Sequence, residues 1–208
     1  VTGMEQQDIL SMTLPELQAA VQELGEPKFR AKQIFNWLHQ KRVTDFSEMT
    51  TLSLPFRERL ASDFCINRLK IAKRLASSVD DTVKYLYELP DGNYVETVCM
   101  QYHHGTSLCI STQVGCRMGC RFCASAIAGF VRNLTPAEML LQIYETERAQ
   151  NCKISSLVLM GIGEPLDNFD NVLRFLQLLS DPNGYGMSLR HVTVSTCGVV
   201  PKILELEI

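Results

Sequence analysis

Apolar positions recur with the helical period over the first third of the chain. A capping-box pattern that begins at Thr13 predicts a helix to about Leu24. Two further helices are predicted, over residues 28–41 and 54–63. The first of these two places four apolar side chains on one face: Ala31, Ile34, Phe35 and Leu38. We therefore expect a small, compact helical unit at the start of the chain.

The period changes from about 3.6 to two between residues 69 and 112. Apolar and aromatic residues alternate with other residues over 83–88, a Pro-Asp-Gly-Asn turn follows at 90–93, and 94–102 reads as a returning strand. This pattern predicts a β-hairpin that links the helical unit to the rest of the chain.

Beyond the hairpin, short apolar runs alternate with helical patterns. Strands are predicted at 107–112, 156–160 and 191–196, and helices at 135–150 and 168–179. Continuous apolar strands joined by helices are typical of a parallel sheet. The fold class is therefore α/β, with three β/α units in the second half of the chain.

Composition narrows the class of protein. The chain has 208 residues and is 46% hydrophobic, and no apolar run approaches the roughly 20 residues that a membrane helix needs. Residues 1–10 are polar and acidic, which predicts no signal peptide. Eight cysteines in a chain without a secretory signal favour metal binding or catalysis in the reducing cytoplasm over a disulfide scaffold.

Charge is distributed unevenly along the chain. The net charge is −3, but residues 26–74 hold eleven Lys and Arg against five Asp and Glu, a local +6 that leaves −9 for the remainder. A basic segment joined to an acidic body fits an RNA-docking module beside a catalytic domain. An ordinary solvated face on small helices is the alternative.

Three cysteines with spacings of four and three residues carry the strongest chemical signal: Cys116, Cys120 and Cys123. A 4Fe-4S cluster usually takes four Cys ligands, so three leave one iron open to a substrate. Zinc sites follow the same rule, closed with four ligands and open with three. A zinc knuckle that uses a distant His, or a chance cluster of buried thiols, are the alternatives.

The residues around these cysteines resemble the RlmN/Cfr family of radical S-adenosyl-L-methionine (SAM) RNA adenine methyltransferases, and RlmN more than Cfr. The likeness runs from about Leu14 to the last residue and rests on several ordered motifs. These are the lead-in and cysteine motif over 108–123, GFVRNL over 129–134, MGIGEPLDN over 160–168 and HVTVSTCGVVP over 191–201.

The resemblance also implies an architecture. The family's catalytic domain is an incomplete barrel of six β/α units, so the three units found here imply the first half of a partial (β/α)6 radical SAM barrel. We expect a helical RNA-docking domain at 1–66, a hairpin linker at 67–106 and the half barrel at 107–208. A half barrel ends in an unpaired parallel edge, and residues 204–208 read as mid-helix, so we expect a piece of a longer protein.

Site roles follow from the same resemblance. It assigns Cys116, Cys120 and Cys123 to three irons of the cluster, whose open iron binds SAM. Reduction of the cluster would then cleave SAM to a radical. Gly163 and Glu164 inherit contacts to SAM, and Ser195 matches a SAM-binding serine. A tight turn with a solvent-facing acid is the alternative for the Gly-Glu pair.

Two residues outside the cysteine motif match catalytic positions of the family. Cys109 matches a cysteine that releases the product by forming a disulfide with a methyl-carrying cysteine, which this chain lacks. Glu96 matches a proton acceptor beside the target adenine. Burial on an otherwise apolar stripe would raise the pKa of Glu96, whereas the alternative is an exposed acid on an edge strand.

The function implied is methylation of C2 of an adenine in 23S rRNA, and of the matching adenine in tRNA, with two SAM per turnover. A flavodoxin or ferredoxin would supply electrons to a cytoplasmic monomer. The alternatives are a Cfr-like C8 methyltransferase and an inactive iron–sulfur or zinc RNA-binding fragment. The remaining cysteines are interpreted as packing residues: Cys65, Cys99, Cys152 and Cys197. His103 and His104 are interpreted as a pair without metal-binding partners.

Overall fold

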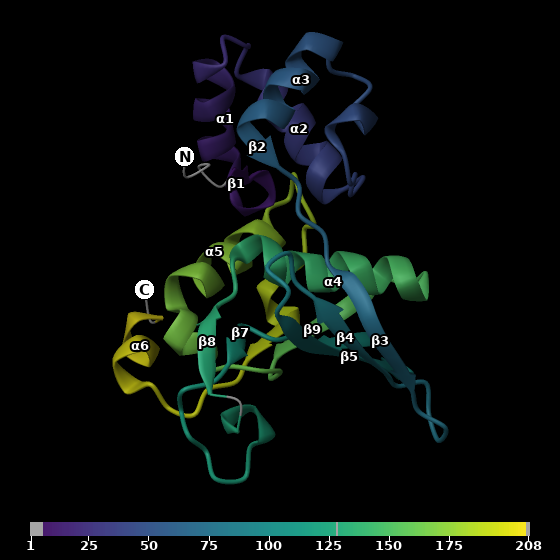
Figure 1. Cartoon of the computed structure of the whole chain (residues 1–208), viewed down its shortest axis with the longest axis vertical. Helices are drawn as coiled ribbons and strands as arrows, with labels where there is room; N and C mark the ends of the chain where they lie inside the picture. Colours follow the sequence, from purple (N-terminus) through teal and green to yellow (C-terminus); the bar gives the residue numbers. More distant parts are fainter. Residues whose placement is uncertain (1–5, 128, 207–208) are drawn as a thin grey trace.

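The computed structural model describes residues 6–127 and 129–206. The N-terminal helical unit stands above the rest of the molecule (Figure 1). Its helices confirm the three predicted ones: α1 (Leu14–Glu23), α2 (Phe29–His39) and α3 (Leu54–Asp63). Thr13 and Glu16 form the predicted capping box. Short parallel strands tie the two ends of this unit together: β1 (Gln7–Asp8) and β2 (Phe64–Cys65).

A mixed sheet forms the centre of the second part. Its order is β10-β9-β6-β5-β4-β3, where β6, β9 and β10 run parallel and β3 to β6 pair antiparallel. The bounds are β3 (Lys70–Ala76), β4 (Val83–Glu88), β5 (Tyr94–Tyr102), β6 (Gly105–Cys109), β9 (Ile154–Leu159) and β10 (Val192–Val194). The hairpin that the sequence predicts as a linker therefore extends the same sheet.

The three β/α units are confirmed. Helix α4 (Pro136–Gln150) connects β6 to β9, and α5 (Phe169–Ser180) connects β9 to β10. Both helices lie on one side of the sheet, and α6 (Val200–Glu205) follows β10 (Figure 1). Within the described residues β10 pairs only with β9, so it forms the parallel edge that the half barrel predicts. Glu207 and Ile208, part of the predicted terminal helix, lie outside the described residues.

The two faces of the sheet differ in burial. Residues that are partners across the strands point to the same face. One such row is covered by helices and almost fully buried: Val83, Cys99, Leu108, Leu157 and Val192. The adjacent row on the opposite face is half-buried or exposed: Lys84, Val98, Cys109, Val158 and Thr193.

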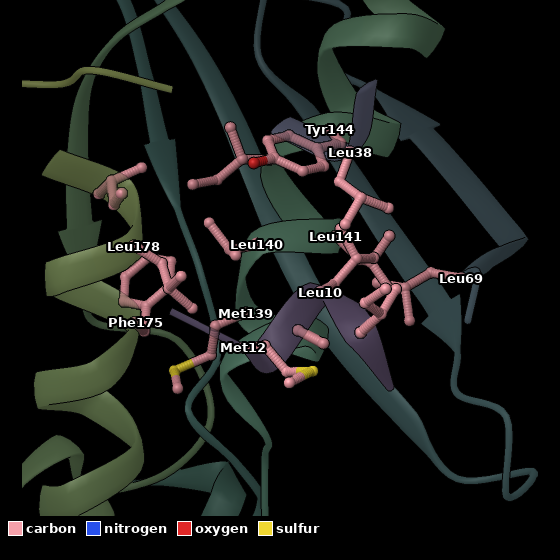
Figure 2. Packing of buried hydrophobic residues seen from close by; sticks show 14 of the residues in the cluster. Leu10, Met12, Leu38, Leu69, Met139, Leu140, Leu141, Tyr144, Phe175 and Leu178 are labelled. Carbon is pink, nitrogen blue, oxygen red and sulfur yellow. The ribbon is translucent and has the colours of Figure 1, made fainter. Parts of the chain in front are cut away.

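One hydrophobic core joins the helical unit to the helices of the sheet. Figure 2 shows Leu10 and Leu38 from the helical unit beside Leu141 of α4, with Phe175 of α5 in the same cluster. No helix in the described part of the chain combines the length and apolar character needed to cross a membrane.

Candidate metal centre

A two-stranded ribbon presents the three cysteines. Strands β7 (Gln113–Gly115) and β8 (Phe130–Asn133) pair antiparallel and hold between them the cysteine loop, which we define as residues 116–127. The loop is closed by a hydrogen bond from Cys116 N–H to the Gly129 carbonyl at 3.1 Å. Gly115 has a φ of +72°, and a Cβ there would lie 1.7 Å from the Gly129 oxygen, so only glycine permits this closure.

The cysteine loop forms one wall of an open cavity of about 260 Å³. The opposite wall comes from the turns that follow β9 and β10. The lining brings together six of the predicted site residues: Cys116, Cys120, Cys123, Gly163, Glu164 and Ser195. These turns lie at the carboxyl ends of parallel strands, where α/β proteins place their sites.

The donor set of this cavity fits an iron–sulfur cluster. Hydrogen bonds from Ser125 lower the pKa of the Cys123 thiol, which favours the thiolate that binds metals. In the described part of the chain, no three His, Cys, Asp or Glu side chains lie close enough together to hold one metal ion. A 4Fe-4S cluster would bond each of the three thiolates to a different iron.

Glu164 joins the two turns of the opposite wall. Its side chain is buried, with the residue only 4% exposed. Oε1 accepts the Leu166 N–H at 2.9 Å and Oε2 accepts the Cys197 N–H at 2.7 Å. A carboxylate has about four lone-pair sites, so each oxygen can still accept from a ligand. Glu164 therefore fixes the cavity wall and also offers an acceptor to a cation.

Gly163 allows a close approach inside the protein. It has a φ of +105°, and a Cβ at this position would lie 2.6 Å from Cβ of Gln113. The backbone after β9 can therefore pack directly on Gln113. The resemblance gives Gly163 a contact to SAM. The structure shows that Gly163 also packs against Gln113.

Cys197 corrects one sequence interpretation. The sequence treats this residue as packing, but the side chain is exposed and lines the same cavity as the three loop cysteines. The Glu164 carboxylate raises the pKa of Cys197 to about 11, because it accepts from the thiol and repels the thiolate. The residue is therefore a fourth thiol in the cavity, held in its protonated form.

Sequence reasoning also missed a buried hub. Gln113 is fully buried. Its Oε1 accepts the Glu164 N–H at 2.9 Å, and its Nε2 donates to Asn133 Oδ1 at 2.8 Å and Asp167 Oδ2 at 2.7 Å. Asp167 in turn pairs with Arg117 of the cysteine loop, Nε to Oδ2 at 2.9 Å. Gln113 lies within the motif that carries the resemblance, but its polar character alone indicates no role.

Cys109 and Glu96 are outside the lining of this cavity. Both lie on the open face of the sheet, where the Ser111 hydroxyl donates to the Glu96 carbonyl at 2.6 Å. Burial raises the pKa of the Cys109 thiol. None of the eight cysteines, all of which fall within the described residues, forms a disulfide.

The burial expected for Glu96 is not found. Its side chain is 41% exposed and pairs with Lys84, whose Nζ lies 2.6 Å from Oε1. The buried face of β5 is the opposite one, which carries Val95, Thr97 and Cys99. The desolvation that the sequence analysis assumed for this carboxylate is therefore absent from this arrangement.

Three further cysteines and the histidine pair lie outside the lining of this cavity. Cys99 is buried and Cys65 and Cys152 are half-buried. His103 and His104 are exposed in the turn between β5 and β6, where the His104 ring stacks on Tyr102. They belong to no group of metal-binding side chains in the described ranges.

Two family profiles match the chain. Residues 7–66 match the ribosomal RNA large subunit methyltransferase N-terminal domain, and residues 110–207 match the radical SAM superfamily. The first match covers the helical unit. The second covers the parallel strands β9 and β10, the cysteine loop and both turns of the cavity.

Similar proteins carry the same combination. The chain is 52% identical over 205 residues to a probable dual-specificity RNA methyltransferase RlmN from Lachnoclostridium phytofermentans, covering 97% of this chain and 57% of that relative. A protein of the same description from Lachnospira eligens is 50% identical over 96% of this chain and 57% of its own length.

A solved structure shares the fold. The crystal structure of a radical SAM methyltransferase from Sphaerobacter thermophilus matches with a TM-score of 0.89 at 35% identity. The match covers 96% of this chain and 60% of that one. The chain thus spans a little under two thirds of the proteins it resembles.

Proposed function

The chain belongs to the RlmN family of the radical SAM superfamily, and we propose that the protein methylates C2 of an adenine in 23S rRNA and of the matching adenine in tRNA. The observation that carries this proposal is the cavity in which three cysteines face the turns after β9 and β10. An aromatic C–H carbon has no lone pair with which to attack SAM, so a radical route suits this substrate.

The cysteine loop supplies the ligands. Cys116, Cys120 and Cys123 would hold a 4Fe-4S cluster with one iron left for SAM. When bound, the reduced cluster would supply the electron that cleaves SAM. The chain's own contribution would be to ligate the cluster, to close the loop through Gly115, and to lower the pKa of the Cys123 thiol through its hydrogen bonds with Ser125.

The opposite wall would bind SAM. The backbone at Gly163, the Glu164 carboxylate and the Ser195 hydroxyl are the candidate contacts, since all three residues line the cavity. Glu164 offers a buried negative charge to the ammonium group of SAM. Because its two oxygens also bind backbone N–H groups, the carboxylate is held in place before SAM arrives.

The open face of the sheet carries the two remaining candidates. Cys109 would act as the thiol that resolves the product by disulfide formation, and Glu96 as the proton acceptor beside the adenine. Burial raises the pKa of the Cys109 thiol, which favours the protonated form. Lys84 forms an ion pair with Glu96, and this pair would have to break when the adenine binds beside Glu96.

The basic segment would bind RNA, with residues 1–66 as the docking domain. Several of its cations are already paired, as Arg42 is with Glu147, Arg59 with Glu26 and Arg68 with Glu145. Strand β3 is exposed along its whole length and carries Lys70, Lys73 and Arg74. We propose that these three residues extend the RNA surface. The protein would act as a cytoplasmic monomer reduced by a flavodoxin or ferredoxin.

Product analysis tests this function. The full-length protein, which would supply the methyl-carrying cysteine that this chain lacks, is reconstituted anaerobically and incubated with SAM, a reductant and an rRNA fragment. The nucleosides are then separated by chromatography and mass spectrometry. We expect 2-methyladenosine. A methyl group on C8 would assign the protein a Cfr-like activity instead. Zinc in the purified protein, with RNA binding but no SAM cleavage, would identify a binding module.

A further inference from the structure

An ion pair connects the cysteine loop to the turn after β9. Arg117 follows the first loop cysteine, and Asp167 follows the Gly163–Glu164 turn by three residues. Their side chains meet with Arg117 Nε 2.9 Å from Asp167 Oδ2. The guanidinium also lies 3.8 Å from the centroid of the Phe130 ring, at the start of β8. Arg117 is thus held from two sides, by a carboxylate and by an aromatic face.

The same carboxylate oxygen continues into the core. Asp167 Oδ2 accepts from Gln113 Nε2 at 2.7 Å, and Gln113 Oε1 accepts the Glu164 N–H at 2.9 Å. The contacts therefore run from Arg117 through Asp167 and Gln113 to the backbone of Glu164. They join both walls of the cavity, although the side chains of Arg117, Asp167 and Gln113 are not part of its lining.

The burial of Gln113 explains how the position of Asp167 affects the position of Glu164. Arg117 is 52% exposed and Asp167 is 22% exposed, whereas Gln113 is fully buried. Gln113 cannot turn away from the Glu164 N–H without leaving a buried donor unpaired. A shift of Asp167 is therefore passed on to Glu164, and Arg117 determines where Asp167 lies.

We propose that Arg117 and Asp167 are positioning residues that set the spacing between the cysteine loop and the SAM-binding turn, acting through Gln113. The proposal rests on the proposed function, since SAM has to contact both walls. Neither residue touches the cluster or SAM in this account. Their loss weakens SAM binding while the three cysteines still ligate iron.

The test compares Arg117→Met, Asp167→Asn and the double variant in reconstituted protein. Iron content and the electron paramagnetic resonance signal of the reduced cluster report the metal centre. Titration of that signal with SAM gives the dissociation constant. Arg121→Met is the matched control, because Arg121 is an exposed arginine of the same loop. Arg117→Lys keeps the charge and is the rescue variant.

We expect full iron content and a SAM dissociation constant about fivefold higher in each single variant. The double variant should match the singles, because both remove the same contact. Arg117→Lys should recover part of the affinity, and Arg121→Met should bind SAM as the parent does. Unchanged affinity in Asp167→Asn, or additive losses in the double variant, overturns the proposal. If the parent itself binds no SAM, the proposed function fails instead.

Discussion

Two glutamines, Gln142 and Gln113, are fully buried, but they connect different regions of the molecule. Gln142 of α4 accepts from the Thr97 hydroxyl at 2.8 Å and the Ser111 N–H at 2.9 Å, and it donates to the Ser111 carbonyl at 3.0 Å. Its partners belong to the helix-covered side of the sheet. Gln113 binds the Glu164 backbone, Asn133 and Asp167, which surround the cavity.

The comparison shows that burial alone does not distinguish a fold residue from a site residue. Only one residue, Thr112, lies between Ser111, which contacts Gln142, and Gln113. Ser111 also donates from its hydroxyl to the Glu96 carbonyl and accepts the Ile162 N–H at 3.0 Å. The segment 111–113 is therefore where the scaffold and the site meet, and a change on one side should be separable from a change on the other.

The largest effect should come from the cysteine loop. Cys120→Ala removes one of the three proposed cluster ligands and should abolish the visible absorbance of the reconstituted cluster. The unfolding transition of the protein prepared without metal should stay within about 0.5 kcal/mol of the parent, because Cys120 is not part of the core. Iron analysis and urea unfolding check both parts. A variant that keeps its full cluster contradicts the ligand assignment.

Gln142→Leu should damage the scaffold. The change leaves the Ser111 N–H, the Ser111 carbonyl and the Thr97 hydroxyl without a partner in a buried layer. We expect the free energy of unfolding to fall by about 3 kcal/mol. Urea unfolding measures this loss, and the folded fraction should still bind SAM with the parent's affinity. A large loss of SAM affinity in the folded fraction would show that Gln142 supports the site as well as the scaffold.

The helix-covered side also contains a group sensitive to pH. His39 is buried, its Nδ1 lies 2.9 Å from the Tyr144 hydroxyl, and its Nε2 has no hydrogen-bond partner among the residues that the structure describes. Burial lowers the pKa of His39 to about 4. The unfolded chain binds a proton near pH 6.5, so this contribution to stability is complete above about 6.5 and is lost as pH falls toward 4.

From this shift we expect about 2 kcal/mol less stability at pH 5 than at pH 7. His39→Leu should remove that part of the pH dependence, and His103→Gln, at an exposed histidine, should leave it in place. Urea unfolding at the two pH values gives the difference. An equal slope in parent and His39→Leu would show that another group is responsible.

Gln113→Met should affect the site more than the scaffold. It removes the acceptor of the buried Glu164 N–H and the donor to Asp167. We expect SAM to bind about tenfold more weakly, with a smaller loss of unfolding free energy than in Gln142→Leu. Titration with SAM and urea unfolding of both variants give the comparison. The reverse ranking would show that the two glutamines do not divide the roles.

The smallest effect should lie on the proposed RNA surface. Lys73→Gln removes one exposed cation from β3. The affinity for an rRNA fragment should fall about twofold, and the slope of log affinity against log salt should decrease by about one. Lys153→Gln, whose ammonium lies over Tyr185 away from β3, is the control. A salt slope unchanged by Lys73→Gln removes β3 from the RNA surface.

Local patterns predicted the elements well because helices and strands follow the spacing of apolar residues. The stripe from Ala31 to Leu38 and the capping box at Thr13 place two helices within a few residues. The extension of the hairpin into the central sheet was not predicted, since the pairing of Val98 with Cys109 depends on how the chain folds back. Period two alone does not say which face is covered.

The site was predicted in part for the same reason. The three cysteines are close in sequence, so their spacing indicates a common ligand. Gln113 bonds to residues 20, 51 and 54 positions away, and no local pattern indicates such contacts. The exposure of Glu96 likewise depends on the neighbouring Lys84 and on the open face of the sheet.

The central claim is that the cysteine loop and the turns opposite it form one site for a cluster and SAM. Electron paramagnetic resonance of the reduced, reconstituted protein, recorded with and without SAM, tests it most directly. The account predicts a 4Fe-4S signal that changes shape when SAM is added, because SAM would bind the iron that the three cysteines leave open. A signal that SAM leaves unchanged, or a protein that takes up zinc and no iron, would contradict it.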